Sequence, residues 1–225
     1  MSSGNGGGTG GGRTVSPRRD AVRNRDALLA AARGLFAERG LDVPFDDVAR
    51  RAGLGSATLY RHFPNRAALV GAVYGDLLDA TARAGRRALD ESDAWAGLGA
   101  YVTAVYAELA ADPGANDLMT TAIPGITALD ALHEEHRRTV ARLVARAQEQ
   151  GAMRGDVAVE DLLLALAAVG RTVPALAALD GAWQRQLALL LDGLRAPAPV
   201  PLPGRAPTGD ELADVLHALG PRLGR

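Results

Sequence analysis

The residues with the clearest chemical potential form a short run of hydroxyl, guanidinium and imidazole side chains between residues 55 and 66. Such groups donate hydrogen bonds to phosphate oxygens, and hydroxyl and methyl groups also contact the edges of bases. The run contains Gly55, Ser56, Ala57, Thr58, Tyr60, Arg61, His62 and Arg66. This combination of side chains points to recognition of a nucleic acid.

A second cluster, His133-Glu134-Glu135-His136, contains residue types that bind metal ions. Two histidines three residues apart on a helix could share an ion, but the HExxH spacing, with a general base between two ligands, is missing. No convincing third ligand accompanies them, and the run HEEHRR is typical of a solvated helix face. The sequence therefore predicts no metal site, no cofactor and no enzymatic activity.

Two short helices joined by a tight turn must position the polar run. Phe45–Ala52 has apolar residues at the spacing of one helical face, and Gly53 follows where the chain must turn. Ser56–Phe63 is the second predicted helix, which either Gly55 or Ser56 can begin. A helix of this size can enter a major groove with its N-terminal end against the bases.

Two longer helices are predicted on either side of this pair. The first runs from about Asp20 to Arg39 and ends at Gly40, and its role is to brace the second short helix. Its predicted inward face consists of Val22, Leu29, Ala32 and Phe36. The other begins after Pro64, with Asn65 as its N-cap residue, and continues towards Leu89.

Three stretches of this segment share their residues with a known family. They are LFAERG (Leu35–Gly40), DDVARRAGL and TLYRHFPNRAAL (Thr58–Leu69). In these stretches, residues 21 to 75, roughly a quarter of the chain, resemble the DNA-binding domain of TetR/AcrR bacterial transcription regulators. The resemblance implies an all-α fold, with an N-terminal three-helix helix-turn-helix domain and a C-terminal helical ligand-binding and dimerisation domain.

The resemblance also implies roles for the polar run. Ser56, Ala57 and Thr58 match positions that face bases or their phosphates in the family. Tyr60 and His62 match positions that bind phosphate. Arg66 stands where the family commonly has a lysine that touches the DNA backbone.

Two residues depart from the family pattern at the start of the first short helix. Pro44 replaces a threonine that caps this helix and touches a phosphate, and proline offers no donor. Asp46 places a carboxylate where some members have a basic or polar contact, and a carboxylate repels phosphate. These departures leave open a TetR-like helical protein that acts through a protein partner rather than DNA.

The charge distribution separates a basic part of the chain from an acidic part. Residues 1–66 contain 11 arginines and 6 acidic residues, a balance of +5, and the remainder contains 14 arginines and 20 acidic residues, a balance of −6. This asymmetry is typical of a protein that binds DNA at one end. The chain has no cysteine, no signal core and no apolar run of about 18 residues, so we expect a cytoplasmic protein without disulfides or membrane segments.

Four regions are expected: a disordered glycine-rich tail (1–19), the helix-turn-helix domain (20–66), the ligand-binding and dimerisation domain (67–195), and a proline-rich linker with a C-terminal helix (196–225). In the third region, helices are predicted over about 94–110, 117–123, 127–150, from about 159, and over 182–194, with a stop at Asp112-Pro113-Gly114. The last helix, Thr208–Leu219, has Thr208 and Glu211 at capping-box spacing.

The helices beginning near Val159 and spanning Ala182–Leu194 are predicted to form a homodimer surface, because the first is apolar on more than one face. Two antiparallel helices per subunit can form a four-helix bundle across a two-fold axis. Arg171 interrupts an apolar helix, so it is predicted to pair with an acid at the dimer interface, to reach solvent or to bind a ligand carboxylate.

The resemblance further implies a small-molecule effector bound among the helices of the third region. The candidate ligand residues are Tyr74, Trp95, Tyr101, Tyr106, Met119, His133 and Arg171. We therefore expect a ligand-responsive regulator, a repressor by analogy with the family, that binds a double-stranded DNA operator as a homodimer. Arginine supplies salt-dependent affinity, residues 56–58 read bases, and DNA shape contributes to specificity.

Overall fold

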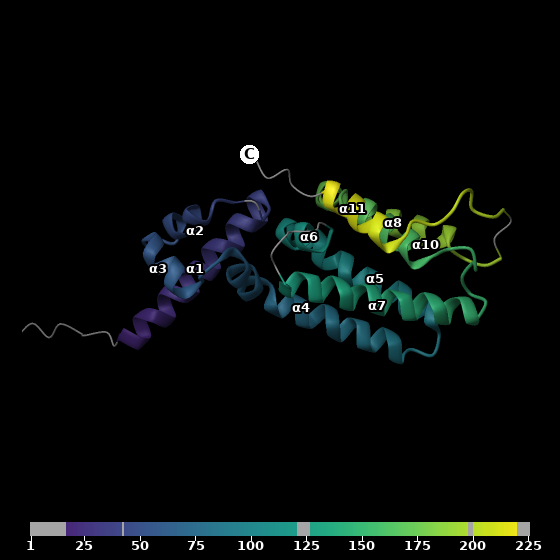
Figure 1. The fold of residues 1–225 in the computed structure, drawn as a ribbon, viewed down its shortest axis with the longest axis horizontal. Coiled ribbons are helices and arrows are strands. Elements are labelled where there is room, and N and C mark those ends of the chain that lie inside the picture. The colour runs from purple at the N-terminus through teal and green to yellow at the C-terminus, as the bar shows by residue number, and fades with distance from the viewer. Residues whose placement is uncertain (1–16, 42, 121–126, 198–199, 220–225) are drawn as a thin grey trace, which may run out of the picture.

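The computed structural model describes residues 17–41, 43–120, 127–197 and 200–219, and every regular element within these ranges is a helix. The helices are α1 (Pro17–Arg39), α2 (Phe45–Arg51), α3 (Ser56–His62), α4 (Arg66–Asp90), α5 (Ala94–Ala111), α6 (Pro113–Thr120), α7 (Thr127–Glu149), α8 (Val159–Gly170), α9 (Val173–Leu176), α10 (Ala182–Gly193) and α11 (Gly209–Leu219). Figure 1 shows α1–α3 at one end, α4 leading away from them, and a bundle of helices at the other end. The predicted all-α fold is confirmed.

Helices α1–α3 and the beginning of α4 enclose a first hydrophobic core, together with two residues of α6. Two glycines with left-handed φ angles shape this unit as predicted. Gly40 (φ +76°) ends α1, and Gly53 (φ +68°) turns the chain between α2 and α3. The largest buried side chains of this core are Leu28, Phe36, Leu59, Phe63, Leu69 and Tyr74.

The first turns of α1 differ from the prediction. The helix begins at Pro17, so residues 17–19, which were predicted to be part of a disordered tail, are helical. Val22 is 58% exposed, and the prediction that it faces the core is wrong. The reason is that this end of α1 extends beyond α2 and α3, so no neighbouring helix covers it (Figure 1). The rest of the predicted tail, residues 1–16, lies outside the described residues.

Helix α4 passes from the first core into a second one formed by the C-terminal helices. It buries Val70 and Tyr74 in the first core and Ala84 and Ala88 in the second. Its start is fixed as predicted, because Oδ1 of Asn65 accepts a hydrogen bond from the N–H of Ala68 at 2.9 Å. A single long helix therefore carries the chain out of the helix-turn-helix unit.

Helix α6 begins earlier than the predicted helix over 117–123. It starts at Pro113, which suits the first turn of a helix because proline has no N–H to leave unpaired. Oδ1 of Asp112 accepts hydrogen bonds from the N–H groups of Gly114 and Ala115 at 2.8 and 3.2 Å. The predicted stop at residues 112–114 is thus the cap of the next helix, and residues 121–123 lie outside the described residues.

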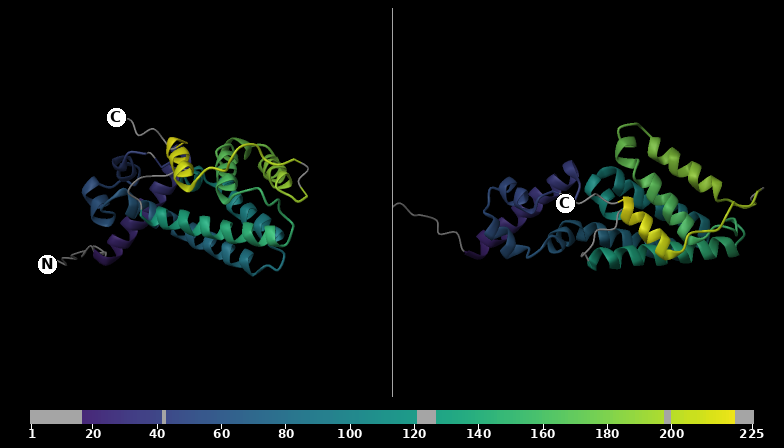
Figure 2. Two further views of the ribbon diagram at one scale, coloured as in Figure 1. Left: turned by 45° about the vertical axis from the view of Figure 1, so that its right-hand side comes forward. Right: turned by 45° about the horizontal axis from the view of Figure 1, so that its top comes forward.

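The second core joins α4, α5 and α7–α11. Helices α7, α8 and α10 agree with their predicted ranges within one or two residues, and Gly151 (φ +69°) follows α7. The single-turn helix α9 was not predicted, since a segment of four residues with a proline has no readable periodicity. Figure 2 shows α8 and α10 side by side in this bundle, where they pack against each other.

Helix α11 ends the described chain and packs on α8 (Figure 2). Its predicted capping box is present. The N–H of Thr208 donates to Oε2 of Glu211 at 2.8 Å, and Oγ1 of Thr208 accepts from the N–H of Glu211 at 3.3 Å. The prediction that this helix follows a proline-rich linker agrees with the structure for residues 196, 197 and 200–207.

Two glycines of α5 give a test of how closely α4 and α5 pack. A Cβ at Gly97 would lie 2.5 Å from the backbone oxygen of Ala88, whereas a Cβ at Gly99 would meet only Cδ1 of Leu191 at 4.0 Å. Gly97→Ala should reduce the free energy of unfolding by about 1–3 kcal/mol, because backbone must move to admit the methyl group. Gly99→Ala should leave it unchanged or raise it by up to about 1 kcal/mol, since alanine favours helix. Urea denaturation of both variants measures the difference, and equal effects would contradict the close approach.

Candidate nucleic-acid interface and internal cavity

Helix α3 is held against the core by one face and presents polar residues on the other. Leu59 is completely buried, and the turn before the helix is closed by a hydrogen bond from the N–H of Leu54 to the oxygen of Ala49 at 2.9 Å. Gly55 is the N-cap residue, and its oxygen accepts from the N–H of Thr58 at 2.9 Å. Exposed or half-buried on the outer face are Ser56, Ala57, Thr58, Tyr60, Arg61 and His62.

Two aromatic residues of α3 are positioned by contacts inside the domain. The Tyr60 ring packs edge-on against Phe45 of α2, with centroids 5.1 Å apart, yet the residue remains 49% exposed. His62 is half-buried, and its Nε2 is buried without a hydrogen-bond partner among the described residues. This leaves the Tyr60 hydroxyl and Nδ1 of His62 as groups for an external acceptor.

Arg66, predicted to touch the DNA backbone, is engaged inside the protein. Its guanidinium donates to the oxygen of Val43 at 2.7 Å and also to the oxygen of Leu41, both in the segment between α1 and α2. The side chain therefore ties the beginning of α4 to the loop before α2. A contact with phosphate remains a prediction, and it would have to use the N–H groups that these two bonds leave free.

The start of α2 carries no group that donates to phosphate through its side chain. Pro44 is the N-cap residue without a side-chain bond, and Asp46 is exposed. Asp47 is occupied by Arg50 at 2.6 Å and by Arg39 at 3.5 Å. Exposed side-chain donors are therefore present on α3 but not at the start of α2.

A cavity of about 320 Å³ lies in the C-terminal part of the chain, between α5, α6, α7, α8 and α11. Most of its wall is aliphatic. The lining residues are Val102, Val105, Tyr106, Leu109, Met119, Thr120, His133, Glu134, His136, Arg137, Leu163, Leu166, Ala167, Gly209, Leu212, Ala213 and Leu216. The volume lies at the small end of the range of about 300–1,000 Å³ that is typical of ligand sites.

The polar part of the cavity wall comes from α7. Nδ1 of His136 lies 2.8 Å from the Tyr101 hydroxyl, and Nε2 of His133 lies 2.9 Å from the oxygen of Leu118. Burial, and to a smaller extent the neighbouring His133, lowers the pKa of His136 to about 4, so its ring is neutral at pH 7. Glu134 pairs with Arg137 at 2.9 Å, and hydrogen bonds from Arg137 and Arg138 lower the pKa of this carboxyl.

Comparison with known proteins identifies the family. A family model described as "Bacterial regulatory proteins, tetR family" matches residues 28–73, and one described as "Transcriptional regulator SbtR-like, C-terminal domain" matches residues 93–196. The chain belongs to the TetR family of transcriptional regulators. The family predicted from the motifs in residues 21–75 is confirmed, with the matches extending over both halves of the chain.

The chain is similar to several individual proteins. HTH-type transcriptional regulator SAB2452 of Staphylococcus aureus (strain bovine RF122 / ET3-1) is 38% identical over 53 residues, which cover 23% of this chain and only 29% of that protein. The crystal structure of a TetR transcription regulatory protein from Mycobacterium vanbaalenii is 33% identical, covering 80% of this chain and 99% of that one, with a TM-score of 0.44. The probable transcriptional regulatory protein RHA5900 is 28% identical over 77% of this chain and 100% of that one, with a TM-score of 0.57.

Three of the seven ligand residues predicted for this TetR-family chain line the cavity: Tyr106, Met119 and His133. Tyr101 lies behind the wall and reaches it only through His136. Arg171 is the exposed C-cap residue of α8, and Trp95 packs against the Arg195 guanidinium, 4.9 Å from its ring centroid. These three side chains are not part of the described lining.

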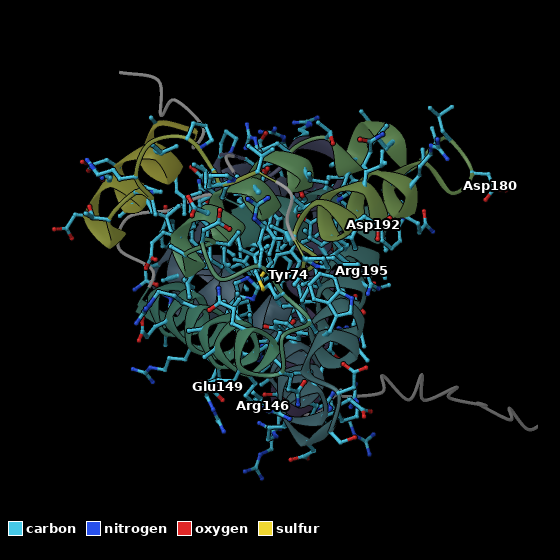
Figure 3. All side chains as sticks on the ribbon, turned by 90° about the vertical axis from the view of Figure 1, so that its right-hand side faces the viewer. Tyr74, Arg146, Glu149, Asp180, Asp192 and Arg195 are labelled. Atoms are coloured by element: carbon cyan, nitrogen blue, oxygen red, sulfur yellow. The ribbon has the colours of Figure 1, made fainter. Side chains whose placement is uncertain are left out.

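Tyr74 is the fourth candidate outside the cavity. It is 2% exposed and belongs to the first core, where its ring centroid lies 6.2 Å from that of Phe36. Figure 3 shows it near the centre of the molecule in the view along the long axis. Its hydroxyl lies 3.4 Å from Oδ1 of Asp112, and burial, reinforced by that carboxylate, raises its pKa. Its ring serves core packing instead.

The prediction missed the remaining lining residues, above all His136 and the α11 side chains. The run HEEHRR was interpreted as a solvated face, but a neutral histidine can line a cavity while its neighbours remain exposed. Leu212 and Leu216 are four residues apart on an amphipathic helix, which signals an apolar face that needs a partner. That spacing was visible in the sequence, but it does not say which helix the face covers.

Helix α6 connects the cavity with the helix-turn-helix domain. Leu118 is buried in the first core, whereas Met119 lines the cavity and packs against both cores. Oδ2 of Asp117 accepts a hydrogen bond from the N–H of Leu41 at 3.2 Å, just after α1. The described residues contain no group of three or more potential metal ligands and no helix that is long and apolar enough to span a membrane.

Arg61 of α3 and Arg66 at the beginning of α4 should contribute differently to stability. Arg66→Ala removes both hydrogen bonds to the loop before α2, so we expect the free energy of unfolding to fall by about 1–3 kcal/mol. Arg61 is exposed and has no ion-pair partner among the described residues, so Arg61→Ala should change this free energy by no more than about 0.5 kcal/mol. Urea denaturation of the two variants is the measurement. A stable Arg66→Ala variant would show that Arg66 does not hold the loop.

Proposed function

We propose that this TetR-family regulator is a repressor that binds an operator as a homodimer and releases it when a small molecule occupies the cavity. The observation that carries the proposal is the position of α6, whose Met119 contacts the cavity and whose Asp117 holds the end of α1. A ligand can regulate DNA binding only if it binds one arrangement of the chain more tightly than the other. Helix α6 is shared by the cavity and the helix-turn-helix domain. A ligand that binds more tightly when α6 is displaced would therefore favour a different position of the helix-turn-helix domain.

DNA recognition is assigned to α3. We expect its N-terminal residues Ser56, Ala57 and Thr58, which are exposed or half-buried, to meet base edges, since the N-terminal end of a recognition helix contacts bases in the major groove. We expect the exposed Tyr60 and Arg61 to bind phosphates. The exposed carboxylate of Asp46 opposes a phosphate contact at the start of α2, so the electrostatic attraction is assigned to α3.

Homodimerisation is assigned to α8 and α10, which pack against each other. Helix α8 buries Leu162 and Leu166 in its own core yet leaves Ala168 exposed, and α10 exposes Ala188 and Leu189, the latter by 56%. Covering these apolar side chains with the same helices of a second copy removes them from water and produces an isologous interface. Two reading helices then face successive turns of one DNA duplex.

Selection from a pool of random double-stranded DNA tests this proposal without knowledge of the operator. The full chain should enrich an inverted repeat, because a two-fold symmetric dimer reads two equivalent half-sites. Affinity for the selected duplex should fall steeply with salt. Arg61→Ala should reduce the slope of log K against log salt by about one, which is the contribution of one phosphate contact.

The control is Arg142→Ala, which removes an exposed arginine of α7, outside α3 and outside the proposed dimer helices, and should keep the wild-type slope. Enrichment of a sequence without repeat symmetry would contradict the homodimer. If no sequence is enriched even at low salt, DNA reading by this chain is refuted, and a function through a protein partner becomes the better explanation.

A further inference from the structure

One wall of the cavity is formed by a helix that lies outside the residues matched by either family model. Those matches cover residues 28–73 and 93–196, whereas α11 begins at Gly209. Helix α11 contributes Gly209, Leu212, Ala213 and Leu216 to the lining. Leu212 is buried in the second core, whereas Val215, on the flank of the helix, is 41% exposed and is not among the lining residues.

Surface ion pairs hold the segment that leads to α11. Arg154 binds Asp156 at 2.6 Å and also donates to the oxygen of Val200 at 2.8 Å, while the N–H of Leu202 donates to Asp156 at 2.8 Å. Arg205 binds both carboxylate oxygens of Glu211, one of them at 2.7 Å. The Arg154 side chain is only 11% exposed, so its pair with Asp156 anchors the segment before α11. Arg205 and Glu211 are 70% and 45% exposed, and an ion pair this exposed contributes little to stability, so it does not fix α11 itself.

The chemistry of the wall restricts what can lie beneath α11. The sides formed by α5, α8 and α11 are mostly aliphatic, and Glu134 on α7 pairs with both Arg137 and Arg138, so the charged groups of this wall have partners. His136 is neutral and uses Nδ1 for the Tyr101 hydroxyl, and among the described residues Nε2 has no hydrogen-bond partner. The cavity thus combines a mostly apolar surface with Nε2 of the neutral His136 as a hydrogen-bonding group.

We infer that α11 is a movable wall of the ligand site, and that the site takes a small, uncharged, largely apolar molecule with one hydrogen-bonding group directed to His136. Leu212 and Leu216 enclose this molecule against α8, and the ligand leaves when α11 lifts away. The inference deepens the proposed function, because the enclosed molecule is its effector. The movable wall and the class of ligand concern only ligand binding, and they do not depend on DNA binding.

A pair of fluorescent probes tests the inference on the full chain. N-phenyl-1-naphthylamine is uncharged and fluoresces in apolar surroundings, and 1-anilinonaphthalene-8-sulfonate has the same ring system with an added sulfonate. The uncharged probe should bind at least about tenfold more tightly, because the cavity offers no unpaired cation. Ala213→Trp, which fills the cavity from the α11 side, should abolish its binding, and Ala167→Phe, which fills it from α8, should do the same.

The role of α11 is tested by the rate of probe release in stopped-flow experiments. Leu212→Ala combined with Leu216→Ala should release the uncharged probe at least about tenfold faster, because α11 then packs less tightly over it. Val215→Ala, on the same helix but outside the cavity lining, should keep the wild-type rate. Amide hydrogen exchange in α11 should slow when the probe binds. This measurement tests the mobility of α11 in the unsubstituted protein.

Equal release rates in the two α11 variants, or no change in α11 exchange, would refute the movable wall. Tight binding of the sulfonate probe, or binding that survives both filling substitutions, would refute the ligand class. None of these readouts involves DNA, so their failure would leave the regulator proposal intact, and its own test is the DNA selection.

Discussion

Helix α6 has to satisfy two hydrophobic cores at once, and the relation between the two halves of the molecule depends on this constraint. Ala115 and Leu118 are buried with the side chains of α1–α4, whereas Met119 also touches the second core. Interiors are packed too densely for such a helix to shift on one side alone. Any change in the cavity that moves α6 must therefore be felt at the end of α1.

The polar contacts around α6 reinforce this coupling. Asp117 accepts a hydrogen bond from the backbone of Leu41, and a Cβ at Gly40 would lie only 2.2 Å from the same carboxylate. Asp112 caps α6 and lies 3.4 Å from the Tyr74 hydroxyl of α4. Helix α6 thus contacts both the helix that braces α3 and the helix that leaves the domain, while Arg66 fixes the loop between α1 and α2.

The helix-turn-helix unit could be predicted closely because its signals are local. Gly53 is needed for a left-handed turn, Asn65 for a cap, and Leu59 falls at the spacing of a buried face. The error at Val22 has the opposite origin: periodicity marks an apolar face, but only tertiary structure shows whether a neighbour covers it. The hydrogen bonds of Arg66 to the loop before α2 could not be predicted either. An arginine in the sequence does not show whether its guanidinium binds a backbone carbonyl or a phosphate.

The cavity could be predicted only in part, because its members come from five helices that are distant in the sequence. Large aromatic residues were the natural candidates, yet Tyr74 and Tyr101 are used for packing and for positioning. The lining depends on which side of each helix faces inward, and this is decided by the mutual packing of α5, α7, α8 and α11. The place of α11 over the cavity follows from no local signal at all.

Amide hydrogen exchange at Gly40 and Leu41 tests the coupling through α6 most directly, by comparing Met119→Ala with Val105→Ala. Both substitutions shorten a side chain that lines the cavity and so enlarge the cavity. Met119 lies on α6, however, whereas Val105 lies on α5. If α6 links the cavity to the end of α1, Met119→Ala will speed exchange at these two amides, and Val105→Ala will leave it at the wild-type rate. Equal exchange in both variants and the wild type would contradict the account, because the cavity would then have no mechanical connection to the reading domain.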